Sequence, residues 1–278
     1  MTADKLKTGK VIKNILFALL VLIIVIPVLF PIYFVFISSF KNMAQVYTMP
    51  PKFFGFKPIL DNYIYIFRTQ HYGTYMFNST IVAVVSTALS LAAGVPAAYA
   101  IARYKMRKTN TAILTARLLP NISILLPYYF IFSKLHLIDT FLVLILSHMI
   151  LSLPLIVWIM TGFFEELPLE LEEAAIVDGC TRQKCFLDIL IPISAPGLVT
   201  CSTLSFLGSW NNFQFALILS GEKTRTLPVS LQYFVSGADI RWGRMLAATI
   251  VVIVPTIILT MILQKYIIQG MTAGAVKG

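Results

Sequence analysis

Histidine and cysteine side chains are best suited to bind a metal ion or to act as a base or nucleophile, and in this chain they are scattered. The 278 residues include three cysteines and three histidines. The closest pair, Cys180 and Cys185, lacks the spacing of a zinc site or a disulfide framework. His71 and His136 are isolated in predicted loops, and His148 stands alone in a predicted membrane span. The phosphate-binding pattern GxxxxGK[ST] does not occur. We therefore expect no metal site and no catalytic residues, and any nucleotide must be bound by a different chain.

Carboxylates concentrate in one segment, residues 165–192, which reads EELPLELEEAAIVDGCTRQKCFLDILIP. Every other Asp and Glu maps to a loop, a tail or the end of a predicted span. An ion-coupled secondary carrier is expected to bury carboxylates within its spans. A membrane-embedded enzyme needs paired carboxylates, a histidine cluster or a nucleophile with a base at the membrane face. Neither pattern is found, so the carrier is kept only as the weaker alternative.

The acidic segment carries the signals of two short helices. Pro168 suits a first helical turn, the glutamates between 170 and 173 favour a helix N-terminus, and Gly179 is a natural left-handed stop. We expect a helix, a turn and a second helix that ends at Pro192.

An apolar stripe is expected on the second of these helices. Arg182, Cys185 and Ile189 share one face, and Phe186 and Leu190 share a neighbouring one. So short a helix can dock into a groove of a partner protein. The alternative is a helix that rests on lipid headgroups, which the glutamates disfavour because anionic lipid repels them.

The composition indicates which solvent surrounds these elements. The chain is 58% hydrophobic and 12% charged, whereas soluble domains carry about 25% charged residues. The mean hydropathy is +0.83, so the lipid bilayer is the expected surroundings of most of the chain. The formal charge of +10 comes from short basic clusters between long apolar runs, which fits lipid headgroups and topology better than nucleic acid.

Six apolar runs predict an all-α membrane protein with a single domain, residues 1–278. A span needs about 20 residues, and the first run is too long for a signal-peptide core of about 7–15 residues. The expected spans are 15–37, 75–102, 111–132, 140–163, 193–219 and 245–268, with a loop at 164–192 and a tail at 269–278.

Basic residues indicate the orientation. Lysines precede the first span, and a second cluster crowds the short connection after the second span, so both places are expected to be cytoplasmic. With six spans, both termini then lie in the cytoplasm. The outer loops also hold basic residues, so the bias is local. The two cytoplasmic clusters are Lys5, Lys7, Lys10 and Lys13, and Arg103, Lys105, Arg107 and Lys108.

A spaced motif in the acidic loop resembles that of a known family. Glu173-Ala174-Ala175, three residues, Gly179, nine residues, then Ile189-Leu190-Ile191-Pro192 resembles the EAA motif of ABC importer permeases, which reads EAA, x3, G, x9, I-x-L-P. The one departure is Ile191 where Leu is usual, a swap of equal volume. The resemblance implies a bacterial inner-membrane protein with the type I ABC importer permease fold, whose cytoplasmic coupling helices sit in a cleft of a separate ATPase that binds ATP and Mg. The implied coupling residues are Glu173, Ala174, Ala175, Asp178, Gly179, Arg182, Ile189 and Pro192.

A second resemblance concerns the C-terminal tail and the fifth span. Residues 264–278 and the run Trp210-Asn211-Asn212-Phe213 are similar to permeases of maltose-type carbohydrate importers, specifically the six-span partner subunit. This implies a second homologous permease, an ATPase dimer, an extracytoplasmic solute-binding protein and a sugar substrate. The tail residues Thr272, Ala273, Gly274 and Lys277 would reach between the two ATPase subunits, unless the glycine-rich tail is disordered. A polyol or a glycerol phosphodiester is the alternative cargo.

Polar residues inside the spans are candidates for a hydrophilic solute path. Amide, hydroxyl and aromatic side chains recognise sugars, although each can equally join helices, and an arginine near a span end can snorkel. In the maltose system, sugar contacts belong mainly to the other permease subunit. The candidates are Arg117, Asn121, Tyr128, Trp210, Asn211, Asn212 and Gln214.

Overall fold

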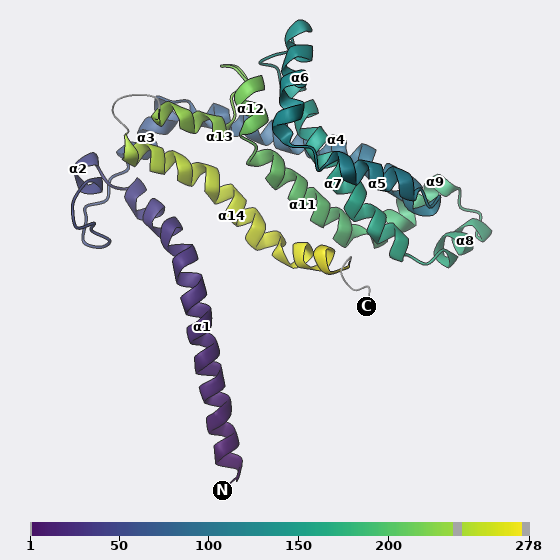
Figure 1. Ribbon diagram of the computed structural model, residues 1–278, viewed down its shortest axis with the longest axis horizontal. Coiled ribbons are helices and arrows are strands. Elements are labelled where there is room, and N and C mark those ends of the chain that lie inside the picture. Colours follow the sequence, from purple (N-terminus) through teal and green to yellow (C-terminus); the bar gives the residue numbers. More distant parts are fainter. Residues whose placement is uncertain (1, 236–240, 274–278) are drawn as a thin grey trace. The chain divides into compact units, whose positions relative to one another are not determined.

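The computed structural model describes residues 2–235 and 241–273, with side chains for 13–235 and 241–265. Every regular element in these residues is helical (Figure 1). The first elements are α1 (Thr2–Ser39), α2 (Met43–Val46), α3 (Asp61–Arg68), α4 (Tyr72–Arg103), α5 (Arg107–Ala116), α6 (Asn121–Lys134) and α7 (Phe141–Glu166). They are followed by α8 (Glu170–Val177), α9 (Arg182–Cys185), a π turn (Phe186–Leu190), α10 (Ile191–Ile193), α11 (Ala195–Trp210), α12 (Gln214–Leu219), α13 (Leu227–Ser230), a 3-10 turn (Leu231–Phe234) and α14 (Trp242–Ala273).

The chain forms two compact units. Residues up to 70 and 231–251 make the first unit, and residues 71–230 with those from 252 onward make the second. Within the first unit, the Asn62 side chain of α3 donates hydrogen bonds to the carbonyls of Ser39 and Lys41, at 2.8 and 2.9 Å. The Arg244 guanidinium lies 3.5 Å from the centre of the Tyr65 ring. These contacts join the end of α1 to α3, and α3 to the start of α14.

Four described helices are long and apolar enough to cross a membrane, and the number rises to six if each of two bent helix pairs counts as one span. The four are 13–39, 72–103, 141–166 and 242–265. They overlap the first, second, fourth and sixth expected spans. The third and fifth expected spans differ from the expectation because neither is a continuous helix.

The third expected span, 111–132, is interrupted. Helix α5 ends at Ala116, α6 begins at Asn121, and the two are bent by 85°. Pro120 lies directly before α6, and a proline offers no N–H to a helix and disfavours helical backbone in the residue before it. The chain therefore turns at a point where the hydrophobic pattern alone predicts a continuous span.

The fifth expected span, 193–219, is also divided. The helical run 182–193 bends by 76° into α11, which ends at Trp210, and α12 begins only at Gln214. Pro192 does not end the second loop helix as expected, because it lies inside α10. In the preceding π turn the Ile191 N–H is bonded to the Phe186 carbonyl, so the regular α-helical pattern is already interrupted directly before the proline.

The core of the second unit lies where α4, α7 and α11 pack side by side (Figure 1). Gly94 lets α4 approach α7, since a Cβ there would come within 2.9 Å of the Ile156 side chain. One apolar cluster gathers around the ends of α4 and α7 that adjoin the acidic loop, and includes Ile101 and Phe164. A second cluster lies toward their other ends and includes Val82 and Leu144.

A carboxylate organises the loop between α12 and α13. Asp139 accepts hydrogen bonds from the backbone N–H groups of Gly221, Lys223 and Thr224, at 2.8, 3.2 and 3.0 Å, and from the Thr224 hydroxyl at 2.8 Å. Burial alone would raise the pKa of the Asp139 carboxyl, but the hydrogen bonds from Thr224, Lys223 and Gly221 favour the ionised form and hold that pKa below its usual value.

Candidate functional site

The acidic loop folds into two short helical segments joined by a tight turn, as expected. Helix α8 is followed by Asp178 and then by Gly179, whose φ of +85° lies in the left-handed region that suits glycine. Thr181 begins the next segment, and its side chain accepts a hydrogen bond from the Lys184 N–H at 3.2 Å. The turn at Gly179 therefore fixes the direction in which α8 extends from the rest of the unit.

Helix α8 has one covered face and one uncovered face. Ala175 is its buried residue and belongs to the apolar cluster at the end of α4 and α7. Glu173 and Ala174 are exposed. Ile176 and Val177 are 47% and 85% exposed, so no described residue covers this apolar surface. The exposed surface of α8 thus combines carboxylates with uncovered apolar side chains.

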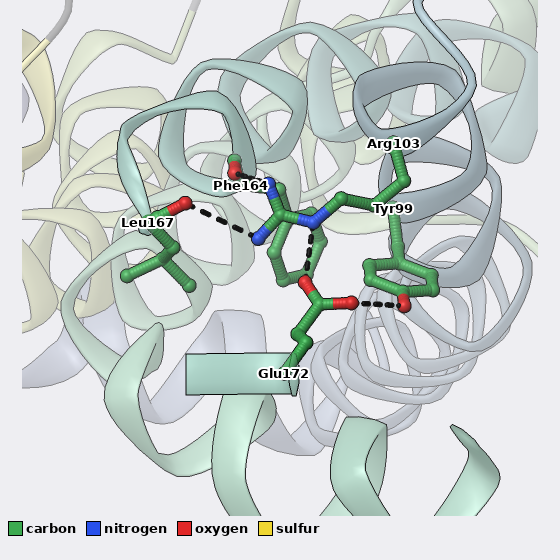
Figure 2. Close-up of polar contacts among 5 residues, drawn as sticks. All are labelled: Tyr99, Arg103, Phe164, Leu167 and Glu172. Carbon is green, nitrogen blue, oxygen red and sulfur yellow. Dashed lines mark hydrogen bonds and ion pairs between the residues drawn. The ribbon is translucent and has the colours of Figure 1, made fainter. Parts of the chain in front are cut away.

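An ion pair fastens α8 to the two long helices beside it (Figure 2). The guanidinium of Arg103, in the last turn of α4, pairs with the Glu172 carboxylate and donates to the Phe164 and Leu167 carbonyls, at 2.7 and 3.3 Å. The Tyr99 hydroxyl donates to the other Glu172 oxygen at 2.7 Å. One arginine thereby contacts α8, the C-terminal end of α7 and, through its own backbone, α4.

Both partners of this pair are largely buried, because the Arg103 and Glu172 side chains are only 11% and 13% exposed. A buried ion pair keeps its geometry when the remaining donors of its charged groups are also hydrogen-bonded. Here the Phe164 and Leu167 carbonyls accept hydrogen bonds from the other guanidinium nitrogens. A cation at the carbonyl end of a helix is further favoured by the helix dipole. In the sequence, Arg103 was identified only as one of the basic residues that indicate the orientation in the membrane. Nothing in the sequence paired it with Glu172, 69 positions later.

The apolar stripe of the second loop helix packs on the chain's own core, whereas the expectation was a free face suited to a partner. Cys185 and Leu190 are buried in the chain's own core, and Phe186 and Ile189 are partly buried against the same cluster. The Tyr99 ring lies 5.0 Å from the Phe186 ring. The segment leads directly into α11, which packs on α4 and α7, so its apolar face meets that core first.

The remaining residues of the predicted coupling set are at the surface. Asp178, Arg182 and Pro192 are exposed. The Arg182 guanidinium donates to the Tyr104 hydroxyl at 3.3 Å. The exposed surface of the loop is therefore formed by α8 and the turn after it, more than by the second helix.

The predicted tail contacts fall at the edge of what the structure describes. Gly274 and Lys277 lie outside the described residues. Thr272 and Ala273 end α14, and only their backbone is described. The role predicted for these four residues stays a prediction.

The predicted pathway residues do not form one group. Arg117 and Asn121 lie on the wall of a cavity of about 450 Å³. Tyr128 is partly buried, with its ring 5.0 Å from that of Phe132, and Gln214 is exposed at the start of α12.

Three of the predicted pathway residues have structural hydrogen bonds of their own. The buried Trp210 donates its indole N–H to the Val252 carbonyl at 3.1 Å. The Asn211 amide donates to the carbonyl one turn earlier at 2.9 Å. The Asn212 side chain accepts from the Phe215 N–H at 3.1 Å, which caps α12. These bonds join α11 to α14 and shape the break before α12.

The fold and the loop define the class of this protein: a helical membrane protein that crosses the bilayer several times and carries an acidic helical loop. A similar architecture is found in the crystal structure of a bacterial ABC transporter involved in the import of the acidic polysaccharide alginate. The TM-score is 0.78 over 93% of this chain and 97% of that chain, at 22% sequence identity. The predicted fold class, that of a type I ABC importer permease, is confirmed.

Sequence relatives establish the family. Residues 90–273 match the family of binding-protein-dependent transport system inner membrane components, to which this chain belongs. The sulfoquinovosyl glycerol transport system permease of Agrobacterium fabrum is 36% identical over 92% of this chain and 91% of its own length. The trehalose/maltose transport system permease of Thermococcus litoralis is 34% identical over 97% of this chain and 99% of its own length. The chain is thus a permease subunit of an ABC importer, a transport protein and not an enzyme.

Proposed function

We propose that this permease carries a sugar or an oligosaccharide, and that α8 receives the movement of a separate ATPase. The observation that carries the coupling role is the uncovered face of α8, where Val177 is 85% exposed although the neighbouring Ala175 is buried. An apolar surface of this kind is suited to a groove on a partner protein. Support for the cargo comes from relatives named for trehalose/maltose, diacetylchitobiose and sulfoquinovosyl glycerol transport.

The partners follow from the same proposal. An ATPase dimer binds ATP and Mg, a second homologous permease completes the solute path, and an extracytoplasmic binding protein delivers the solute. The acidic loop and both termini lie in the cytoplasm. The Arg103–Glu172 ion pair supports this arrangement, because it requires the basic 103–108 connection and the acidic loop to lie on the same side of the membrane.

Coupling then proceeds through α8 into the spans. When ATP closes the ATPase pair, the groove that holds α8 moves. The Arg103–Glu172 pair and the apolar cluster around Ala175 make α8 move with the ends of α4 and α7. The spans change from an inward-facing to an outward-facing state because the closed ATPase binds one state more tightly than the other.

The test is co-purification of the ATPase with charge-reversed variants of this chain. Glu173→Lys reverses the charge on the exposed face of α8, and Glu222→Lys makes the same change at an exposed position in the loop before α13. We expect Glu173→Lys to release at least half of the ATPase and Glu222→Lys to release none. Equal retention in both variants contradicts the proposed coupling surface.

The cargo is tested on the assembled importer with its own binding protein. Trehalose, maltose, diacetylchitobiose and sulfoquinovosyl glycerol form the solute panel, and the measurement is the stimulation of ATP hydrolysis. We expect at least one of the four to stimulate. Stimulation by none of them, with the ATPase retained, contradicts the sugar assignment and leaves the coupling role standing.

A further inference from the structure

The loop between α2 and α3, residues 47–60, lies beside the C-terminal end of α1 (Figure 1). Measured between ring centres, Phe53 of this loop lies 5.8 Å from Phe30 and 6.3 Å from Phe34 of α1. The ring of the next residue, Phe54, lies 6.3 Å from that of Tyr33. The loop and the helix therefore share one aromatic cluster within the first unit.

These contacts show how far the loop reaches along the membrane span. The apolar run of α1 ends at Ile37, and Phe30 and Tyr33 precede that residue by seven and four positions. At about 1.5 Å per residue, they lie about 10 and 6 Å inside that end. Interfacial segments place their apolar side chains about 5–10 Å into the boundary between headgroups and acyl chains. Phe53 and Phe54 lie at that depth.

The outward surface of the loop is apolar and uncovered. Met49 and Phe54 are 84% and 82% exposed, and Tyr47 is 58% exposed. The span beside the loop is also uncovered, because none of its most apolar window is buried by the described residues. Aromatic side chains are enriched where a membrane protein meets the headgroups. The exposed side chains of the loop therefore share the lipid surroundings of α1.

The loop backbone needs little water to satisfy its polar groups, which matters because an unpaired polar group is costly near lipid tails. The Lys41 ammonium, which is 2% exposed, donates to the Lys52 carbonyl at 2.6 Å. The Tyr33 hydroxyl donates to the Phe53 carbonyl at 3.3 Å. The loop also contains three prolines, which have no N–H that would need a partner: Pro50, Pro51 and Pro58.

Basic side chains accompany the apolar ones. Lys52 and Lys57 are exposed, and no ion pair is described for either. Residues 40–60 contain no Asp or Glu. A lysine can lay its stem along apolar surface while its ammonium reaches the headgroups, and anionic lipid attracts that ammonium. The loop thus combines an apolar contact with a basic one.

We infer that the α2–α3 loop is an interfacial membrane anchor, which inserts Phe54 and Met49 between lipids and binds the phosphate groups of anionic lipids through Lys52 and Lys57. A water-soluble partner fits less well, because the aromatic contacts with α1 place the loop below the end of the span. The anchor holds the C-terminal end of α1 at the membrane surface. The inference depends on neither the cargo nor the ATPase contact of this importer.

The test measures the surroundings of a fluorescent label at position 54. Phe54→Cys is labelled with a nitrobenzoxadiazole dye in the importer assembled with its partner chains, after all native cysteines are replaced. The proteoliposomes contain phosphatidylcholine and phosphatidylglycerol, and the quenchers are lipid with a nitroxide near the top of its acyl chain and aqueous iodide on both sides of the membrane. We expect nitroxide lipid to quench this label roughly threefold more than a control label in water, and iodide to show the opposite order.

The control label is placed on Glu222→Cys, since Glu222 is an exposed carboxylate in the loop before α13. We expect iodide to quench it and nitroxide lipid to leave it bright. Met49→Cys is a second reporter, because Met49 is 84% exposed and its replacement removes no packed side chain. It should behave like Phe54→Cys, even if the loss of the Phe54 ring disturbs the loop.

A comparison of lipids tests the lysines. Nitroxide phosphatidylglycerol and nitroxide phosphatidylcholine are compared as quenchers of the Phe54→Cys label. We expect the association constant to favour phosphatidylglycerol roughly fivefold per lysine, and the preference to disappear when Lys52→Gln and Lys57→Gln are combined. Lys223→Gln, which removes an exposed lysine outside the loop, is the control and should keep the preference.

Four results would overturn the inference. Iodide quenching of both loop labels, without quenching by nitroxide lipid, places the loop in water. Protection from both quenchers places it against another protein chain. Iodide quenching that disappears when the binding protein is added identifies the loop as a docking surface for that protein. Equal association constants for the two lipids remove the role of the lysines.

Discussion

Arg103 and Glu172 show what one residue pair contributes to this protein. An exposed salt bridge adds little stability, but breaking a buried one leaves an uncompensated charge. Here the guanidinium also supplies hydrogen bonds to two carbonyls at the end of α7, and Tyr99 supports the carboxylate. The pair therefore determines how firmly α8 is joined to the spans.

Removal of the carboxylate tests this pair. Glu172→Ala leaves the Arg103 guanidinium without its partner, so we expect the free energy of unfolding to fall by on the order of 3 kcal/mol. Solute-stimulated ATP hydrolysis should fall as well, since α8 is then loosely held. Glu222→Ala, at an exposed carboxylate in the loop before α13, is the control and should change neither quantity. Equal thermal unfolding of the two variants in detergent would contradict a structural role for the pair.

Asp139 gives a prediction about pH. Its pKa is lowered in the folded protein relative to about 3.9 in the unfolded chain, so its stabilising contribution is complete above that value. The contribution is lost as the pH falls from about 4 through the lower folded pKa. Asp139→Asn should tolerate the local φ of +61°, since Asn adopts left-handed backbone readily, but it lacks the charge.

The measurement is thermal unfolding of the purified protein at pH 7 and pH 3. We expect Asp139→Asn to be about 1–2 kcal/mol less stable than the parent at pH 7. The difference should shrink at pH 3, where the Asp139 carboxyl of the unfolded parent chain is largely protonated. A difference of the same size at both pH values would show that the ionised form is not what stabilises the 221–224 loop.

At the scale of elements, two interrupted spans produce features that continuous helices would not. The bend before α6 brings Asn121 to the cavity, and the bend before α11 lets the loop segment pack on the core. The long helices α4 and α7 form the frame against which both bends are fixed. Close contact of this pair at Gly94 is therefore expected to matter for the whole second unit.

Gly94→Val tests this contact. The new side chain would meet Ile156, because even a Cβ lies within 2.9 Å of it, and α4 and α7 would have to separate. Overpacking of this kind costs about 1–3 kcal/mol, measured as a lower thermal unfolding temperature. Gly162→Ala on α7 is the control, since nothing lies within 4 Å of a Cβ there, and it should be neutral or slightly stabilising. A matching loss of stability in both variants would rule out the contact as the cause.

At the scale of the whole molecule, the orientation in the membrane determines whether an ATPase can reach α8. The orientation is measured with single cysteines introduced at Glu173 and Glu222, in a chain whose three native cysteines are replaced. We expect a membrane-impermeant thiol reagent to label Glu173→Cys only in inside-out vesicles and Glu222→Cys only in right-side-out ones. Labelling of Glu173→Cys from outside would remove the proposed partner from reach.

The sequence by itself determined the class and the family. Long apolar runs require lipid around them, and the motif from Glu173 to Pro192 is defined by spacing along the chain. Both can therefore be recognised without a three-dimensional structure. The helix–turn–helix of the loop was equally predictable, because Gly179 and the glutamates act on backbone within a few residues of themselves.

Only the tertiary structure decided which surfaces are free and which side chains meet. The apolar stripe at Cys185 and Ile189 looked available for a partner, yet it packs on the chain's own core, while the face of α8 stays uncovered. His148 stood alone in the sequence, yet it meets Ser209, 61 positions away, on the wall of a cavity. Periodicity states which residues share a helix face but not what that face meets, because packing depends on where distant helices bend and cross.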